Sequence, residues 1–532
     1  MNRESKLLMS VLILTSWAKG GLGHPINLWI VDVIVLFSIL SLLLNDKKRR
    51  KRFVLCFLPI LLACLHCVVS WTNPSYRIIS QEDIKKIDFD QYFSRETNVE
   101  KIETLRNGFR NIAVVQDKDP KLALAIFLDL KNQFHDKYGQ ANSPCLDLIE
   151  LYEDKLINDP IPFLPETPFS DNAFIYSSIH FICQLAFGVI IFLSLRTRRE
   201  IRFFVYLMAI NGGLLALAGI IQKLNYVPDD DLKEIFGIWD TPEPRYFFSS
   251  FTYKNHWASF ALMCLFASLA ILYQQIKNCR GKIIHEKRLI PTIFSVCLII
   301  VAIPYSGSRS GLTVLLVCFV VFICRILLKI RSDIYKHKIT VLGSSLTLFL
   351  LLCFSFSMSR TTSKEMLNNS LGQYYDLKAG KPPLRFALWQ DLIRQIRNTP
   401  VWGSGFDSYR AINPLYQSKE IRIQRSYGIE FAHRNYTPLV GHGHCDLLEY
   451  TSEFGIPLMI IFFIYPLLCL RTIFRSPSEF PILLLISCLS FLLFSLVDFP
   501  SRTPVCLLLC GAMLGASTKY AKLTLPEGNR KN

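Results

Sequence analysis

The residues best suited to chemistry lie in one short polar stretch, Gly441 to Tyr450, and in Glu453 just after it. The stretch supplies two histidines and two carboxylates at the start of a mostly apolar run that ends near Leu470. Ionisable groups at the end of a membrane-compatible helix are costly and are rarely kept for packing alone. His444 is the candidate general base, because histidine is the side chain that ordinarily titrates near neutral pH. The pattern indicates an enzyme that works at a membrane surface.

A metal site and a structural histidine are the alternatives for this stretch. His442, His444 and Asp446 carry ligand atoms, but ligands at i and i+2 do not share a helix face, and no further histidine has a fitting spacing. We therefore expect neither a metal nor another cofactor. Asp446 is expected to bind substrate or to orient the imidazole of His444, and Glu449 is the other candidate for orienting it.

Three further polar motifs stand at the ends of apolar runs. Ser306 to Gly311 joins two of these runs with small residues, and Arg309 either serves a site there or extends its guanidinium to the interface. Asn255 and His256 open another run, where Asn255 either binds substrate or caps the helix. Arg385 begins an amphipathic helix that ends near Thr399 and is expected to lie on the membrane surface.

The composition requires many membrane helices to hold these motifs. Hydrophobic residues make up 51% of the 532 residues and charged residues only 19%, which is too apolar for a soluble protein of this size. Continuous apolar runs of spanning length predict an all-α polytopic membrane protein. We expect twelve spans, at residues 7–18, 26–44, 53–71, 173–195, 203–223, 256–276, 289–305, 311–328, 339–357, 444–470, 479–497 and 503–517.

Basic residues set the expected orientation of these spans. The formal net charge of +17 comes mostly from clusters in alternate short loops, so the charge indicates topology and not a nucleic-acid partner. With twelve spans all the clusters fall on one side, which makes both termini cytoplasmic. A cleaved signal peptide is the alternative for the first run, although Trp17 to Gly20 is a poor cleavage site.

The expected organisation is five segments. Spans one to three occupy 1–71, a periplasmic helical insertion occupies 72–172, spans four to nine occupy 173–357, a basic periplasmic loop occupies 358–443, and spans ten to twelve with a cytoplasmic tail occupy 444–532. The insertion is acidic, and its apolar spacing predicts helices at 122–134 and 146–156. The loop at 358–443 has excess cations, Arg410 among them, which suit an anionic ligand because guanidinium groups bind phosphate oxygens in pairs.

Most of the sixteen cysteines lie within apolar runs, where they serve as small packing residues. Cys145 and Cys445 are the two expected on the outer side, so a single bridge between them is open.

These motifs together resemble the O-antigen ligase and O-antigen polymerase superfamily over roughly residues 200–500. The resemblance covers an Asn-His pair, a Ser-x-Ser-Arg turn, an Arg-x-x-Leu-Trp helix with a Pro-x-x-Gly-x-Gly turn, and a His-x-Asp-x-Leu signature followed by Glu-x-Gly. The residues are Asn255, His256, Ser306, Ser308, Arg309, Arg385, Leu388, Trp389, Pro400, Gly403, Gly405, His444, Asp446, Leu448, Glu453 and Gly455. Cys445 stands where the family pattern has Asn, and Leu447 where it has Tyr.

The resemblance implies transfer of a glycan from an undecaprenyl-pyrophosphate carrier to a hydroxyl on the outer side of the inner membrane. Arg309 and Arg385 would bind the pyrophosphate, His444 would take the acceptor proton, and direct displacement would invert the anomeric centre. Asn255, His256, Ser306, Ser308, Asp446 and Arg410 are the expected substrate-binding residues. The acceptor stays open between another glycan, a lipid A core and a protein hydroxyl. A transporter of a small solute or anion is the rival class.

Overall fold

The computed structural model describes residues 3–22, 25–45, 47–139, 143–225, 234–240, 247–278, 289–329, 383–418, 420–422 and 440–526, with single positions near 370. The chain forms two compact units. The first unit comprises Met1–Ile60, His180–Tyr375 and Phe463–Asn532, and the second comprises Leu61–Ile179 and Asp376–Phe462. The predicted span at 339–357 and part of the loop at 358–443 lie outside the described residues.

Helices account for most of the described chain, as an all-α fold predicts. Those that coincide with predicted spans are α1 (Arg3–Trp17), α2 (Pro25–Asn45), α3 (Lys47–Trp71), α9 (Asn172–Ser194), α10 (Arg198–Leu224), α11 (Lys254–Asn278), α12 (Leu289–Ser306), α13 (Arg309–Lys329), α19 (Asp446–Phe474), α20 (Glu479–Ser495) and α21 (Pro504–Thr524). Six of the described helices, α9, α10, α11, α12, α19 and α21, are long and apolar enough to cross a membrane. The count of twelve stays a prediction.

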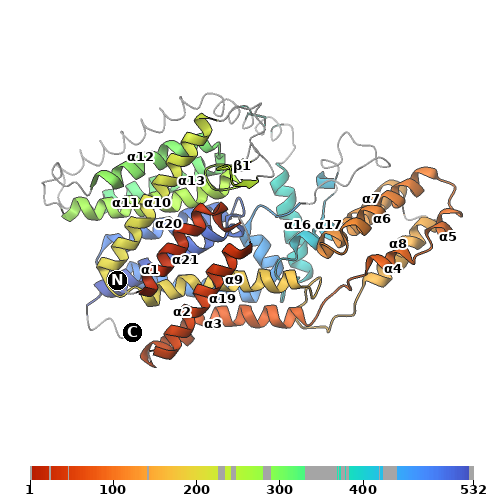
Figure 1. The fold of residues 1–532 in the computed structure, drawn as a ribbon, viewed down its shortest axis with the longest axis horizontal. Helices are drawn as coiled ribbons and strands as arrows, with labels where there is room; N and C mark the ends of the chain where they lie inside the picture. The colour runs from red at the N-terminus through yellow and green to blue at the C-terminus, as the bar shows by residue number, and fades with distance from the viewer. Residues whose placement is uncertain are drawn as a thin grey trace. The chain divides into compact units, whose positions relative to one another are not determined.

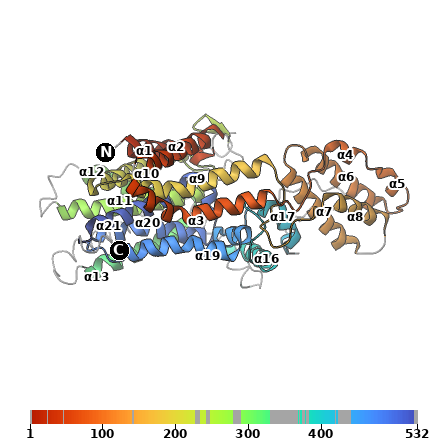
Figure 2. The same ribbon diagram turned by 90° about the horizontal axis from the view of Figure 1, so that it is seen from below.

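Helix α11 lies at the centre of the first unit. It lies among α10, α12, α20 and α21 (Figure 2) and also contacts α13. Nearly all of its apolar side chains are buried. Small residues permit close helix contacts elsewhere in this unit, since a Cβ on Gly188 of α9 would lie 2.7 Å from the carbonyl oxygen of Gly511 in α21. Such close backbone approach is the usual way for membrane helices to associate without a hydrophobic driving force.

The ionisable pair of Asp32 and His180 lies within the apolar helices of the first unit. Asp32 of α2 is buried and bonds through its carboxylate to the ring of His180 in α9, and the Trp29 ring packs edge-on against that imidazole. Ionisable groups at such a position are stable only when they are paired. The pair therefore ties α2 to α9.

The second unit holds the helices of residues 72–172 and the two helices between residues 383 and 417. They are α4 (Gln81–Lys85), α5 (Phe89–Phe93), α6 (Val99–Val115), α7 (Pro120–Tyr138), α8 (Pro144–Leu156), α16 (Leu384–Asn398) and α17 (Tyr409–Tyr416). The helices α7 and α8 lie where the apolar spacing predicts them. Figure 1 shows α6, α7 and α17 side by side, and the core of α4 to α8 includes Ala411 and Ile412 of α17.

The remaining elements are short. A hairpin of β1 (Glu234–Ile235) and β2 (Trp239–Asp240) is the only sheet among the described residues, and single 3-10 turns occupy Lys19–Gly21 (η1) and Pro500–Arg502 (η5). Cys145 and Cys445 are both buried free thiols, so no disulfide joins them.

Candidate active site

His444 lies on a strained backbone immediately before α19. Its φ of 52° is in the left-handed region that residues with a side chain rarely adopt. The indole nitrogen of Trp389 donates a hydrogen bond to the His444 carbonyl at 3.2 Å, and Leu392 packs against Gly443 so closely that a Cβ there would clash at 2.4 Å. The α16 helix thus holds the loop that presents His444.

Arg385 shares a face of α16 with Trp389, because residues four apart in a helix are neighbours. Their Cβ atoms are therefore about 5–6 Å apart. Since Trp389 bonds to the backbone of His444, the structure brings the Arg-x-x-Leu-Trp helix and the histidine motif together within the second unit. The sequence resemblance contains both motifs, but their order in the chain does not imply this contact.

Glu449 organises the loop that precedes His444. Its side chain is 1% exposed, accepts a hydrogen bond from the Gly443 backbone N–H at 2.7 Å, and bonds to Nδ1 of His442 at 2.9 Å. Glu449, one of the two candidates for orienting His444, thus bonds to His442 and to the loop backbone. Asp446, the other candidate, is buried at the first position of α19.

The two glycine motifs of the second unit interlock. The Gly405 N–H donates to the Glu453 carbonyl at 3.0 Å, and the Ile456 N–H donates to the Pro400 carbonyl at 2.9 Å. Gly455 breaks the regular geometry of α19 with a φ of 77°, and a Cβ on it would lie 2.1 Å from the Val401 oxygen. The turn after α16 therefore holds the start of α19 by backbone contacts.

Two charged groups near α16 have different environments. Asp391 is fully buried, and its Oδ2 accepts a hydrogen bond from the Ser418 N–H at 3.0 Å. Burial raises the pKa of Asp391, against the opposing effects of that hydrogen bond and of Arg394. Arg410 of α17 is half exposed and lies 3.3 Å from the carboxylate of Asp119.

The first unit assembles a second polar cluster, around Asn255. The Asn255 amide oxygen accepts a hydrogen bond from the Ser308 hydroxyl at 2.7 Å, and its nitrogen donates to the Asp498 carboxylate at 2.6 Å. Asn255 is the second residue of α11, and its side chain bonds to two other segments instead of capping the helix. The Asn-His pair and the Ser-x-Ser-Arg turn thus meet in this unit.

His256 and Arg309 border that cluster. The buried His256 ring bonds through Nδ1 to the Thr503 hydroxyl at 2.6 Å and packs edge-on against Phe499. Arg309 is the first residue of α13, directly after a turn in which Gly307 has a φ of 72° and the Ser306 hydroxyl donates to the Ile303 carbonyl at 2.7 Å. The predicted reversal of the chain at this turn is confirmed.

Sequence reasoning missed two residues of this cluster. Asp498 is fully buried beside Asn255, and Thr503 bonds to His256. A signal for Asp498 existed, because a lone carboxylate interrupts the apolar residues between 479 and 517. Nothing in the local sequence indicates the contact of Thr503.

The predicted site residues thus form two groups, one in each unit. The first unit holds Asn255, His256, Ser306, Ser308 and Arg309; the second holds Arg385, Arg410, His444 and Asp446. Among the described residues, no group of three or more His, Cys, Asp or Glu side chains is arranged to hold a metal ion.

Comparison with known proteins gives one match. Residues 294–463 match a family model described as O-antigen ligase, a segment that includes Ser306, Arg309, Arg385 and His444. Asn255 and His256 lie upstream of the match. A search of curated proteins gave no match. Residues 294–463 are thus similar to the O-antigen ligase family, and the apolar helices indicate a multi-pass membrane protein.

Proposed function

We propose that the protein transfers a glycan from undecaprenyl pyrophosphate to an acceptor hydroxyl on the periplasmic side of the bacterial inner membrane. The observation that carries the proposal is the pairing of the motifs. The Asn255 amide bonds to Ser308 of the Ser-x-Ser-Arg turn, and Trp389 of the Arg385 helix bonds to the backbone of His444. Motifs that are far apart in the chain and in contact in the fold are what an assembled site requires.

In this proposal the chemistry is one displacement at the anomeric carbon. His444 takes the proton from the acceptor hydroxyl as its oxygen bonds to that carbon, and the bond from the carbon to the pyrophosphate oxygen breaks. Arg309 and Arg385 stabilise the charge that grows on the leaving pyrophosphate, which needs no metal because guanidinium groups supply the positive charge. Attack opposite the leaving group inverts the anomeric centre.

The other expected contacts belong to the same proposal. Asn255, His256, Ser306, Ser308, Asp446 and Arg410 would bind the donor or the acceptor. Twelve spans with both termini in the cytoplasm would place residues 72–172 and 358–443 in the periplasm. A lipid-linked donor also suits a membrane site, since its polyprenyl tail can remain in the bilayer during transfer.

Reconstitution tests this function against its rival. Purified protein in liposomes is given an undecaprenyl-pyrophosphate-linked oligosaccharide and an acceptor, and glycan transfer and solute uptake are both scored. The proposal predicts transfer without uptake. Uptake of a solute without transfer would establish a transporter instead.

The acceptor is identified from the surface glycans of a deletion strain. Loss of attachment with accumulation of free polymer would assign a ligase. Products that carry a single repeat would assign a polymerase, which joins one lipid-linked glycan to another.

A further inference from the structure

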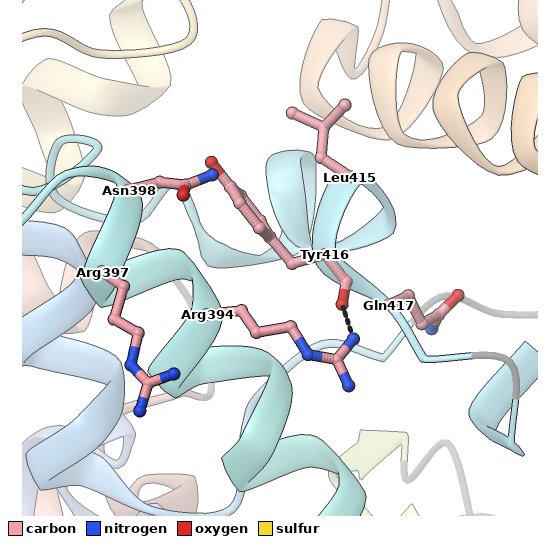
Figure 3. Close-up of a pocket in the computed structure, with 6 residues that line it drawn as sticks. All are labelled: Arg394, Arg397, Asn398, Leu415, Tyr416 and Gln417. Atoms are coloured by element: carbon pink, nitrogen blue, oxygen red, sulfur yellow. Dashed lines mark hydrogen bonds between the residues drawn. The ribbon is translucent and has the colours of Figure 1, made fainter.

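A pocket of about 330 Å³ lies at the C-terminal end of α16, at the opposite end of this helix from Arg385 and within the second unit. Figure 3 shows its lining, which comes from the last turn of α16 and from the end of α17: Arg394, Arg397, Asn398, Leu415, Tyr416 and Gln417. Arg397 lies twelve residues after Arg385, so the two residues are about 18 Å apart along the helix axis. The pocket is therefore distinct from the reacting end of α16.

The pocket has a net positive charge. Arg394 is partly neutralised, since it lies 3.4 Å from the buried Asp391 carboxylate and donates to the Tyr416 carbonyl at 3.4 Å. Arg397 has no hydrogen bond or ion pair with any residue in the described parts of the chain, and its side chain lines the pocket. Because Asp391 offsets only the charge of Arg394, the charge of Arg397 is left for a ligand.

The interaction of arginine with the helix C-terminus is a competing explanation. Cations in the last turn of a helix are favourable without any ligand. That effect does not explain the rest of the lining, in which Tyr416 supplies an aromatic ring and Asn398 supplies a side-chain amide beside the arginines (Figure 3). An aromatic face, amide groups and a guanidinium fork together suit a ligand that has a ring, hydroxyls and an anionic group.

We propose that this pocket binds one anionic sugar residue, carrying a phosphate or a carboxylate, of the glycan that the protein handles. The ring would lie on Tyr416, the hydroxyls would bond to Asn398 and Gln417, and the anion would bond to Arg397 and Arg394. A volume of about 330 Å³ is at the small end of ligand sites, which fits one ring with its substituent. This inference rests on the proposed function, because a glycan bound about 18 Å along α16 from Arg385 must extend away from the reacting end.

Binding to the purified full-length protein tests the pocket without any transfer reaction. Glucose 6-phosphate, glucuronate, glucose and inorganic phosphate are titrated separately and followed by ligand-observed NMR. The proposal predicts saturable binding of the two anionic sugars at least tenfold tighter than binding of glucose or of phosphate alone. Equal binding of phosphate and glucose 6-phosphate would mean a simple anion site and would overturn the sugar assignment; absence of saturable binding would overturn the site.

Variants locate the binding. Arg397→Gln removes the guanidinium that makes no hydrogen bond or ion pair with the described residues. This substitution is expected to weaken binding of both anionic sugars at least tenfold. Arg110→Gln, at an exposed arginine of α6 in the same unit, is the matched control and should change nothing. An unchanged affinity in Arg397→Gln would contradict the proposal. Because these are binding measurements, they can succeed even if glycan transfer is disproved.

Discussion

His444 has a backbone conformation, with a φ of 52°, that costs free energy and that persists only where the surroundings hold it. Trp389 and the tight packing at Gly443 supply those surroundings. The sequence alone is sufficient to choose His444, because a histidine beside carboxylates before an apolar run is unusual. The sequence does not predict the strained backbone of His444 or the hydrogen bond of Glu449 with His442, since both depend on contacts across the loop.

At the residue scale, His444→Ala is expected to abolish glycan transfer while the protein stays in the membrane. Loss of a general base typically costs about 10²–10⁴ in rate. The neighbouring variant His442→Ala removes an imidazole from the same loop and is expected to lower transfer much less. Rates of both variants in the reconstituted assay, with membrane levels by immunoblot, check this. Near-normal transfer by His444→Ala would remove this residue from the mechanism.

Arg309→Lys is expected to lose most of the activity although the charge is kept. An ammonium group is a point charge and cannot replace two parallel guanidinium bonds to a pyrophosphate. A loss of about 10²–10³ in the rate of transfer is typical when a donor to transition-state charge is removed. Arg309→Lys with wild-type turnover would instead support a side chain that only reaches the interface.

Arg410 has two possible partners, a substrate anion and Asp119. Arg410→Gln and Asp119→Asn both break the ion pair of 3.3 Å, and an exposed pair of this kind contributes only about 0–1 kcal/mol to stability. We expect Arg410→Gln to lower transfer several-fold and Asp119→Asn to leave it nearly unchanged. Equal effects of the two substitutions on transfer would assign Arg410 to the ion pair alone.

At the scale of elements, the sequence predicts α16, the turn after it, and the reversal between α12 and α13, because each has a local signal. Amphipathic spacing predicts α16. Gly403 and Gly307 predict the two turns, and both glycines have a positive φ in the structure. The interlocking of the turn with Glu453 and Gly455 was not predictable, since it joins segments about fifty residues apart. The burial of Asp498 beside Asn255 is non-local in the same way.

Gly455→Ala is expected to destabilise the protein and to abolish transfer. A Cβ would lie 2.1 Å from the Val401 carbonyl oxygen. The φ of 77° and ψ of 164° lie in a region adopted almost only by glycine and cost a residue with a side chain about 1–3 kcal/mol more. Gly441→Ala, in the loop that precedes α19, is the control, because no atom lies within 4 Å of its added Cβ. Thermal midpoints and transfer rates of both variants test the contact. A Gly455→Ala protein as stable as Gly441→Ala would contradict the interlocked geometry.

At the scale of the whole molecule, the acidic insertion is part of the second unit. Lys121 of α7 bonds to Asp407 at 3.1 Å, and Ala411 and Ile412 of α17 complete the core of α4 to α8. Composition predicts that residues 72–172 form helices outside the membrane, because they are too polar to insert. It does not predict that α17, more than two hundred residues away, belongs to the same core.

The proposed topology predicts where tags are accessible. An epitope inserted after Gly139, where no atom lies within 4 Å of an added Cβ, should bind antibody in intact spheroplasts. An epitope at the C-terminus should bind antibody only after the inner membrane is permeabilised. The reverse pattern, or both tags on one side, would contradict an even number of spans with cytoplasmic termini.

The central claim is that Arg309, Arg385 and His444 serve one reaction. An experimental structure of the full-length protein with undecaprenyl pyrophosphate bound tests it most directly. The account predicts that both guanidinium groups lie within hydrogen-bond distance of the pyrophosphate, with the His444 imidazole facing the position of the departing sugar. A pyrophosphate bound away from these residues, or Arg309 and His444 on opposite faces of the membrane, would contradict it.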